Sequence, residues 1–345
     1  MPFAPQIEER LRALFRAIKI LSPAEFSLAG RRFPAGQAAP PPGQAAPLPG
    51  AGLITAMQSQ IYAHAYCRRF TGALDAEPTA QPPADEFLEE LMRANQGRER
   101  WEDGWQVYQA DPSGAIFAHK NGLTQMFFPG QFVPPAGGGS AVQQGAVIRV
   151  LMAKESTTMQ PGFYIVLSER SVEQLDQVSF VRFYWNIAAE GAATLTSAVT
   201  GRFNRFQVPF RFKCLSIRQL YGRADAAVLF VPRRFYQFAA QLVEEIYPMI
   251  GENLRPDTPL FSKVLAPGLG LAEDMGNGQS FGLTRCALLA EAIWSAYVKG
   301  VNTEEARLEE TVERFRQNHL DIRQPHLLAG SADIYELPAL LGRAA

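Results

Sequence analysis

The chain has 345 residues, enough to bury one large hydrophobic core or two of ordinary size. Its 33 basic and 34 acidic residues leave a net charge of -1, so nothing suggests a general attraction to nucleic acid or to an anionic membrane. The N-terminus lacks the features of a signal peptide, and no apolar run approaches the roughly 18 residues of a membrane span. We therefore expect a cytoplasmic protein.

Helical patterns dominate the first 100 residues. Residues 6–21 carry apolar side chains at helical spacing, and similar patterns recur at about 53–70 and 85–96. Residues 33–52 are rich in Pro, Gly and Ala and contain too few bulky apolar residues to fold alone. The sequence therefore predicts a helical N-terminal region over 1–100, with a disordered loop at 33–52.

Strand patterns begin with WQVYQADPSGAIFAHK at 105–120, where alternating residues flank a DPSG turn. Further strands are predicted at 147–152, 162–168, 180–187, 208–215 and 226–231, and helices at about 188–203, 234–250, 283–299 and 304–318. Long strands separated by few helices are typical of an α+β fold with a mainly antiparallel sheet and flanking helices. We expect this second domain to cover 101–345.

Two of the predicted strands have one apolar face and one cationic face. In FVRFYWNI, strict alternation places Arg182 and Tyr184 on the face opposite Val181, Phe183 and Trp185. In PFRFKC it likewise places Arg211 and Lys213 opposite Phe210, Phe212 and Cys214. The plainest interpretation is that the cationic face meets water, as one face of an antiparallel sheet often does.

Additional cations favour an anion-binding site instead. Arg223 precedes the predicted strand at 226–231, and Arg285 lies in the first turn of the helix that follows the glycine-rich stretch 266–286. We interpret that stretch as a close-approach loop that brings Ser280, backbone N–H groups and Arg285 to an anion. Neighbouring cations lower the pKa of a lysine, so Lys213 is a candidate general base.

Other chemistries lack their signatures. Zinc-hydrolase, serine-hydrolase, P-loop and dinucleotide-binding motifs are missing, and the three cysteines, Cys67, Cys214 and Cys286, lack metal-ligand spacing. An odd number of distant cysteines suits a reducing compartment. We expect Glu273 and Asp274 to be solvated or helix-capping loop acids and the four histidines to have surface or packing roles. No metal or organic cofactor is expected.

Several runs resemble the family named for the HopA type III effector of plant pathogens. They span roughly 100–340 and include FVRFYWNI, VPFRFKCL, YGRADAAVLFV and PLFSKVLAPGLGLAED followed by GQSFGLTRC. Members also occur in class V lanthipeptide and thioviridamide-like pathways. There the resemblance implies a lyase partner of a separate kinase-like protein. The kinase would phosphorylate Ser or Thr of a precursor peptide, and the lyase would eliminate phosphate, leaving dehydroalanine or dehydrobutyrine.

The sequence is also distantly similar to phosphothreonine lyases, which implies their fold and assigns roles to individual residues. By this similarity Lys213 is the base, and Arg223 and Arg285 hold phosphate. Further candidate phosphate ligands are Arg182, Arg211, Lys263 and Ser280. Thr284 stands where relatives are expected to have an acid-donating histidine. Either Tyr184 is the acid, or phosphate leaves unprotonated with the help of arginines, or the protein has lost catalysis. A non-catalytic peptide-binding partner of a kinase and a secreted effector remain alternatives.

Overall fold

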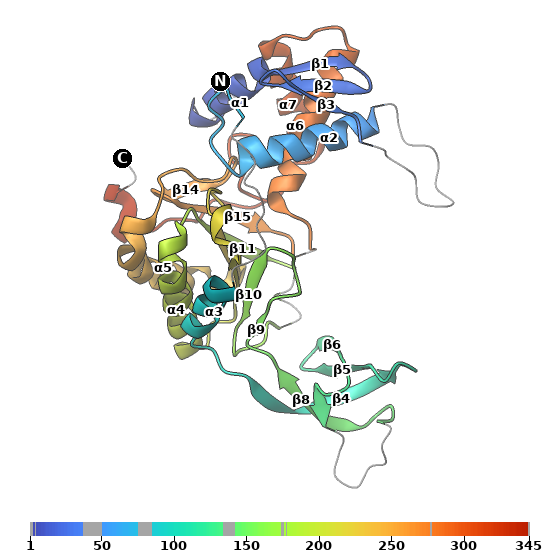
Figure 1. The fold of residues 1–345 in the computed structure, drawn as a ribbon, viewed down its shortest axis with the longest axis vertical. Helices are drawn as coiled ribbons and strands as arrows, with labels where there is room; N and C mark the ends of the chain where they lie inside the picture. Colours follow the sequence, from blue (N-terminus) through green and yellow to red (C-terminus); the bar gives the residue numbers. More distant parts are fainter. Residues whose placement is uncertain are drawn as a thin grey trace.

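The computed structural model describes residues 3, 5–36, 50–74, 85–133, 142–173, 176, 178–276 and 278–343. These residues form helices and three antiparallel sheets, of three, seven and five strands. Figure 1 shows the largest sheet in the middle of the molecule, with the other two at opposite ends. The α+β class with mainly antiparallel sheets, predicted from the sequence, is confirmed.

The seven-stranded sheet carries most of the predicted strands. In spatial order its strands are β14 (Lys263–Ala266), β15 (Leu269–Asp274), β11 (Phe180–Trp185), β13 (Ala227–Pro232), β12 (Arg211–Leu215), β10 (Phe163–Leu167) and β9 (Glu155–Ser156). The prediction of a loop over the glycine-rich stretch 266–286 is wrong for residues 269–274. These residues form the buried strand β15, which lies between β14 and β11. Gly268, at φ 73°, makes the turn between β14 and β15.

One face of this sheet packs against helices α3 (Asp85–Ala94), α4 (Ala189–Arg205) and α5 (Tyr236–Ile250), as Figure 1 shows. Val181, Phe183 and Trp185 of β11 point into this core, and Phe212 and Cys214 of β12 join them. These are the side chains that alternation assigned to the apolar face, so that prediction is confirmed. The short helices η3 (Arg218–Leu220), η4 (Arg233–Phe235), η5 (Gly251–Asn253) and η6 (Pro338–Arg343) connect or follow these elements.

The opposite face of the sheet is covered in part by segments from both halves of the chain. These are α1 (Pro5–Ala17), β1 (Ile18–Ser22), β2 (Glu25–Leu28), β3 (Arg31–Pro34), α2 (Ala51–Ile61), the π-helical turn η1 (Tyr62–Tyr66), α6 (Phe281–Val298) and α7 (Glu304–Gln317). They share one buried apolar cluster with Tyr184 of β11 and Val228 of β13. The packing therefore does not follow the predicted boundary near residue 100, because α6 and α7 complete the core of the N-terminal segments.

The predicted helix over 6–21 is too long. It ends at Ala17, and Ile18–Ser22 forms β1, which pairs with β2. The apolar residues of this segment fit both helical spacing and strand alternation, and pairing with β2 satisfies the backbone as a strand. In the predicted loop at 33–52, residues 37–49 lie outside the described residues, Arg31–Pro34 is strand β3, and α2 begins at Ala51.

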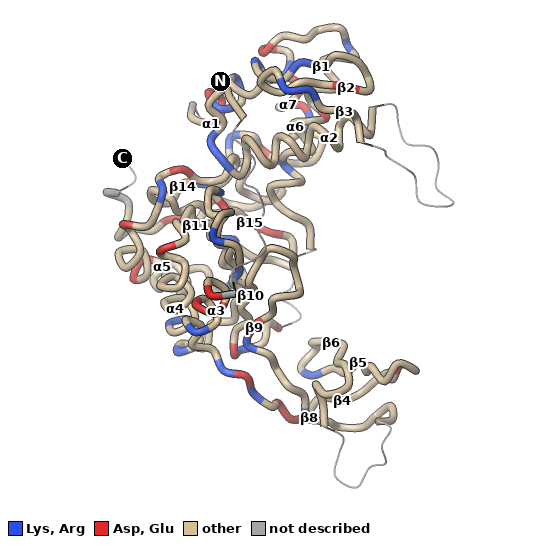
Figure 2. The backbone as a smooth tube through the Cα atoms, viewed as in Figure 1, with Lys and Arg blue, Asp and Glu red and all other residues tan. Residues whose placement is uncertain are grey.

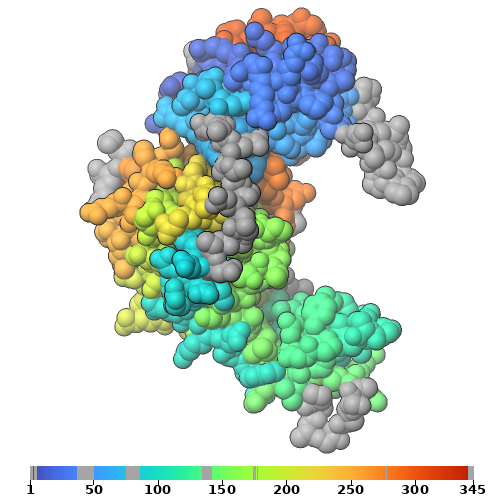
Figure 3. All heavy atoms as spheres, viewed as in Figure 1, coloured from blue at the N-terminus to red at the C-terminus, as the bar shows by residue number. Residues whose placement is uncertain are grey.

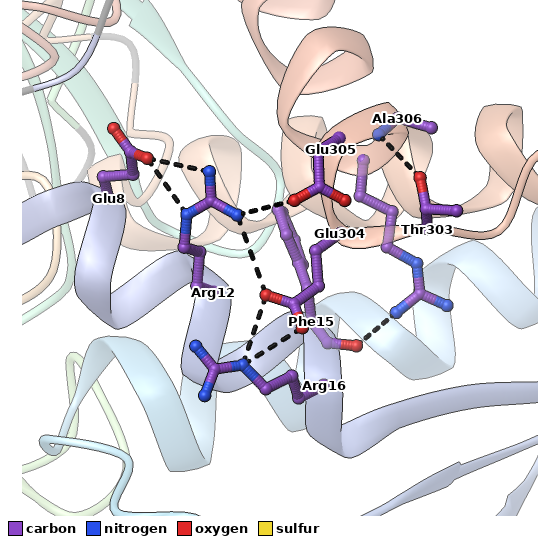
Figure 4. Close-up of polar contacts among 9 residues, drawn as sticks. Glu8, Arg12, Phe15, Arg16, Thr303, Glu304, Glu305 and Ala306 are labelled. Atoms are coloured by element: carbon purple, nitrogen blue, oxygen red, sulfur yellow. Dashed lines mark hydrogen bonds and ion pairs between the residues drawn. The ribbon is translucent and has the colours of Figure 1, made fainter. Parts of the chain in front are cut away.

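Ion pairs join α1 to the start of α7 (Figure 4). Arg12 lies 3.1 Å from a Glu305 carboxylate oxygen, and Arg16 lies 3.1 Å from Glu304. Glu304 and Glu305, in the first turn of α7, also interact favourably with the positive N-terminal end of the helix dipole. Because these contacts are solvent-exposed they add little stability. The buried apolar side chains of α1, such as Leu14, contribute more.

The five-stranded sheet projects from the rest of the molecule. Its strands are β4 (Arg100–Ala110), β5 (Ile116–Lys120), β6 (Leu123–Phe127), β7 (Phe132–Val133) and β8 (Val147–Met152). The predicted DPSG turn is present, and the Ser113 N–H donates to Asp111 Oδ1 at 2.8 Å. The sheet has a small core of its own, around Trp105. Figure 3 shows the molecular surface hollowed between this sheet and the N-terminal segments.

Three observations bear on membranes, metals and thiols. Over the described ranges, no helix combines the length and apolar character needed to cross a membrane. In the same part of the chain, no group of three or more His, Cys, Asp or Glu side chains is arranged to hold a metal ion. All three cysteines are buried free thiols.

Candidate active site

Strand register brings four of the predicted site residues onto one sheet face. Arg182 on β11 and Arg211 on β12 both lie opposite Phe230 of β13, one on each side. Tyr184 and Lys213 occupy the next row in the same way. We call these four side chains, Arg182, Tyr184, Arg211 and Lys213, the cationic face. Figure 2 shows basic residues in the central strands beside β11. The face assignment from alternation is confirmed.

Lys213 is half-buried and lacks an acidic contact within the described chain. Its Nζ donates to Gln160 Oε1 at 3.1 Å and lies 4.4 Å from the centroid of the Phe163 ring. Burial lowers the pKa of Lys213 to about 8; Asp225 opposes the shift, and three neighbouring arginines add to it. The sequence argument gave neighbouring cations as the cause, whereas burial contributes more. A lysine with this pKa is partly neutral at cellular pH.

The two arginines of the cationic face differ in their partners. Arg182 is buried, its Nε donates to Asp274 Oδ2 at 2.6 Å, and its Nη2 donates to the Gln279 carbonyl at 2.7 Å. Arg211 is exposed, and its guanidinium stacks 4.9 Å from the centroid of the Phe230 ring. Among the described residues Arg211 makes no hydrogen bond or ion pair. An incoming anion would therefore meet Arg211 without displacing an acidic partner.

Tyr184 lies at the inner end of the cationic face. The residue is only 3% exposed, and its hydroxyl has no hydrogen-bond partner among the residues that the structure describes. Burial raises the pKa of Tyr184, although the Arg182 charge opposes the shift. The hydroxyl therefore stays protonated near neutral pH and can donate a hydrogen bond. Because most buried polar groups are hydrogen-bonded, this hydroxyl, with Tyr66 and Arg182 as neighbours, is a candidate donor to a ligand.

Arg223 is near the cationic face but is already paired. Its Nε and Nη2 donate to the two Asp225 oxygens at 2.8 and 2.9 Å, and Nη2 also lies 3.1 Å from the Tyr62 hydroxyl. The Arg223 charge contributes to the lowered pKa of Lys213, which places the two groups within electrostatic reach of each other. Arg223 is therefore held in a fixed position, and the charge of its partner Asp225, which acts more strongly on Lys213, offsets its own.

Ser280 and Thr284 are engaged in the start of α6. Ser280 is the N-cap residue, and its Oγ accepts from the Leu283 N–H at 3.3 Å. The Thr284 hydroxyl donates to the Phe281 carbonyl at 2.8 Å. The glycine-rich stretch does contain a close backbone approach, but Gly282 approaches tyrosine side chains of this protein. A Cβ at Gly282 would lie 2.4 Å from the Tyr66 ring.

Arg285 does not join the cationic face as a free phosphate ligand, contrary to the sequence-based expectation. It is 5% exposed, and its Nε and Nη2 donate to the carbonyls of Pro325 and Leu327, both at 3.1 Å. Its guanidinium also packs on the Phe281 ring. Burial lowers the pKa of Arg285 to about 10. Arg285 therefore fastens the segment after α7 to the helix start.

Arg285→Ala should lower the free energy of unfolding by about 3 kcal/mol, because two buried carbonyls lose a charged donor and a cavity forms. Urea denaturation would measure the change, with exposed Arg316→Ala on α7 as the control. Normal stability combined with lost phosphate binding would contradict this structural role and return Arg285 to the anion site.

Lys263, Glu273 and Asp274 also depart from their predicted roles. Lys263 pairs with Asp333 at 2.8 Å, on the sheet face that packs against α4 and α5. Glu273 was expected to be a solvated loop acid, but it is buried in β15 and accepts from the Leu328 N–H at 2.7 Å. Asp274 is the buried partner of Arg182. The chain's fold pairs these residues with groups that are remote in sequence.

Four further residues near the cationic face were not predicted from the sequence. Gln160 contacts Lys213, Asp225 holds Arg223, and Tyr62 and Tyr66 come from η1. Asp225 follows Arg223 by two positions, so the sequence did contain a signal for that ion pair. The tyrosines gave no comparable signal, because their helical spacing resembles that of any buried helix.

Comparisons with known proteins found similar structures and one family. The structure is similar to an effector protein from Pseudomonas syringae pv. tomato strain DC3000, with 16% identity and a TM-score of 0.45, covering 79% of this chain and 90% of that one. An effector protein from Pseudomonas syringae pv. syringae strain 61 shows 14% identity and a TM-score of 0.43, covering 80% and 96%. No curated protein matches. The HopA1 effector protein family matches residues 154–327, half of the chain, and the protein therefore belongs to the HopA1 effector protein family.

Proposed function

We propose that this protein is a cofactor-independent lyase that eliminates phosphate from phosphoserine or phosphothreonine in a ribosomally made peptide. The proposal rests on one observation. Lys213, whose pKa is lowered, and Arg211, which has no acidic partner among the described residues, lie on the same face of the sheet. A base beside an anion site is the minimum that β-elimination of phosphate requires. A separate kinase-like protein would supply the phosphorylated peptide in the cytoplasm.

The side chains take distinct roles in the proposed reaction. The neutral Lys213 amine removes the Cα proton, and that C–H electron pair forms the Cα=Cβ double bond. The Cβ–O bond breaks, its electron pair leaves with the phosphate, and dehydroalanine or dehydrobutyrine remains. Arg211 binds the phosphate directly, while Arg182 and Arg223 stabilise its charge from their paired positions. Tyr184 donates a hydrogen bond to the leaving oxygen, because the Thr284 hydroxyl cannot act as an acid.

The most direct test uses a synthetic phosphothreonine peptide. Incubation with the protein should release inorganic phosphate and give a peptide lighter by one phosphoric acid, both detectable by phosphate assay and mass spectrometry. An unphosphorylated peptide of the same sequence is the control. Tight binding of the phosphopeptide without elimination would favour a non-catalytic partner of the kinase, an alternative motivated by Thr284. Delivery into a host cell is the second alternative, supported by the family's effector members.

The elimination rate should rise with pH. Lys213 acts as a base only when neutral, and its pKa of about 8 means that the neutral fraction increases about tenfold per pH unit well below 8 and levels off above it. The phosphate group is mostly dianionic above its second pKa of about 6, so it adds little variation from pH 7 upward. We expect kcat/KM, measured between pH 6.5 and 9.5, to follow this curve. A rate that falls from pH 7 to 8 would contradict a lysine base.

A further inference from the structure

The π-helical turn η1 contacts the Arg223–Asp225 pair. The Tyr62 hydroxyl donates to Asp225 Oδ2 at 3.2 Å and accepts from Arg223 Nη2 at 3.1 Å. The Arg223 guanidinium also lies over the Tyr62 ring, 5.6 Å from its centroid. One tyrosine thus contacts both members of the ion pair and restricts the orientation of the arginine.

The same turn is fixed to two neighbouring elements. The Ala224 N–H, within the loop that carries Arg223, donates to the Cys67 carbonyl at 2.6 Å. On the other side, Gly282 at the start of α6 approaches Tyr62 and Tyr66 so closely that a Cβ would overlap both rings. The π-helical bond from the Cys67 N–H to the Tyr62 carbonyl, 2.9 Å long, shapes the turn. Such turns are frequent at functional sites.

The contacts of Tyr62 have an electrostatic consequence. Asp225 is buried, yet Arg223, Lys213 and the Tyr62 hydroxyl lower its pKa, so the carboxylate stays charged. Burial raises the pKa of Tyr62, which keeps its hydroxyl protonated as a donor to that carboxylate. An ion pair held in this way keeps its geometry when a second anion approaches.

We propose that η1 is part of the phosphate site and that Tyr62 is a positioning residue, which holds the Arg223 guanidinium toward the phosphate of a phosphorylated peptide. The inference rests on the proposed function, because it assumes that phosphate binds at the cationic face. It also adds a residue from outside the segment 154–327 that matches the family. The N-terminal segment then contributes to substrate binding as well as to packing.

Tyr62→Phe tests this inference, because it removes one hydroxyl and keeps the ring. Tyr297→Phe on α6 is the matched control, since Tyr297 is also half-buried and packs on Trp294 away from Arg223. Calorimetry with inorganic phosphate and with a phosphothreonine peptide should show about tenfold weaker binding for Tyr62→Phe and no change for the control. KM should rise by a similar factor while kcat changes little, measured at a temperature at which both variants are fully folded.

The binding measurement separates this inference from the lyase proposal. Weaker phosphate binding by Tyr62→Phe supports the inference even if the unmodified protein eliminates no phosphate. Equal phosphate binding by Tyr62→Phe and the unmodified protein overturns it, even if elimination is observed. Absence of phosphate binding by the unmodified protein overturns both.

Discussion

Lys213→Ala should lower the rate of phosphate elimination by about 10²–10⁴-fold, the usual contribution of a general base. The pKa of the amine is lowered to about 8, and the amine has no acidic contact among the described residues. The rate would be followed by phosphate release from a phosphothreonine peptide. Activity within tenfold of the unmodified protein would remove Lys213 as the base.

A second variant distinguishes the basicity of Lys213 from its positive charge, and a third serves as a control. Lys213→Arg keeps a cation at this position, but a guanidinium stays protonated at every pH of the assay. It should therefore bind phosphopeptide close to normally and still lose elimination. Lys299→Ala, at the exposed end of α6, is the control for removing a lysine elsewhere and should leave the rate unchanged.

Arg211→Ala should weaken phosphopeptide binding by about 10- to 100-fold, as expected when a charged hydrogen bond to phosphate is lost. Its guanidinium is exposed and stacked on Phe230, without an acidic partner among the described residues. The effect should appear in KM and in calorimetric binding, with binding of the unphosphorylated peptide unchanged.

Arg205→Ala provides a closely matched comparison for Arg211→Ala. Arg205, at the end of α4, is also exposed and also stacks on a phenylalanine, Phe206, at 5.5 Å. It lies on a helix that covers the opposite sheet face. Equal losses of binding in the two variants would mean that a general electrostatic attraction, and not a site at Arg211, recruits the peptide.

The cationic face could be predicted because it depends on local alternation. The period of two in FVRFYWNI and FRFKC determines which side chains share a face, whatever the neighbouring strand. The same argument correctly placed Phe183 and Phe212 in the helix-covered core. Alternation does not give strand order, however, and only the register with β13 brings Arg182 and Arg211 to opposite sides of Phe230.

The partners of the basic residues could not be predicted, because they come from distant segments. Arg182 pairs with Asp274, Arg285 binds carbonyls after α7, and Lys263 pairs with Asp333. From the sequence each of these cations, like Arg211, was a candidate phosphate ligand. Gly270, in β15, was equally ambiguous, because glycine indicates a loop as well as a site where another chain segment approaches closely.

The shared core of the earliest and latest segments has a consequence for biosynthesis. Leu11 and Leu14 share a buried cluster with Ile293 and Phe315, which the ribosome adds only after the strands of the central sheet. Contacts between such distant residues form slowly, and apolar surfaces stay exposed until they do. A nascent chain that has reached only residue 280 therefore carries the side chains of the cationic face but lacks helices α6 and α7, so the covering of that face can be completed only after both helices have been added.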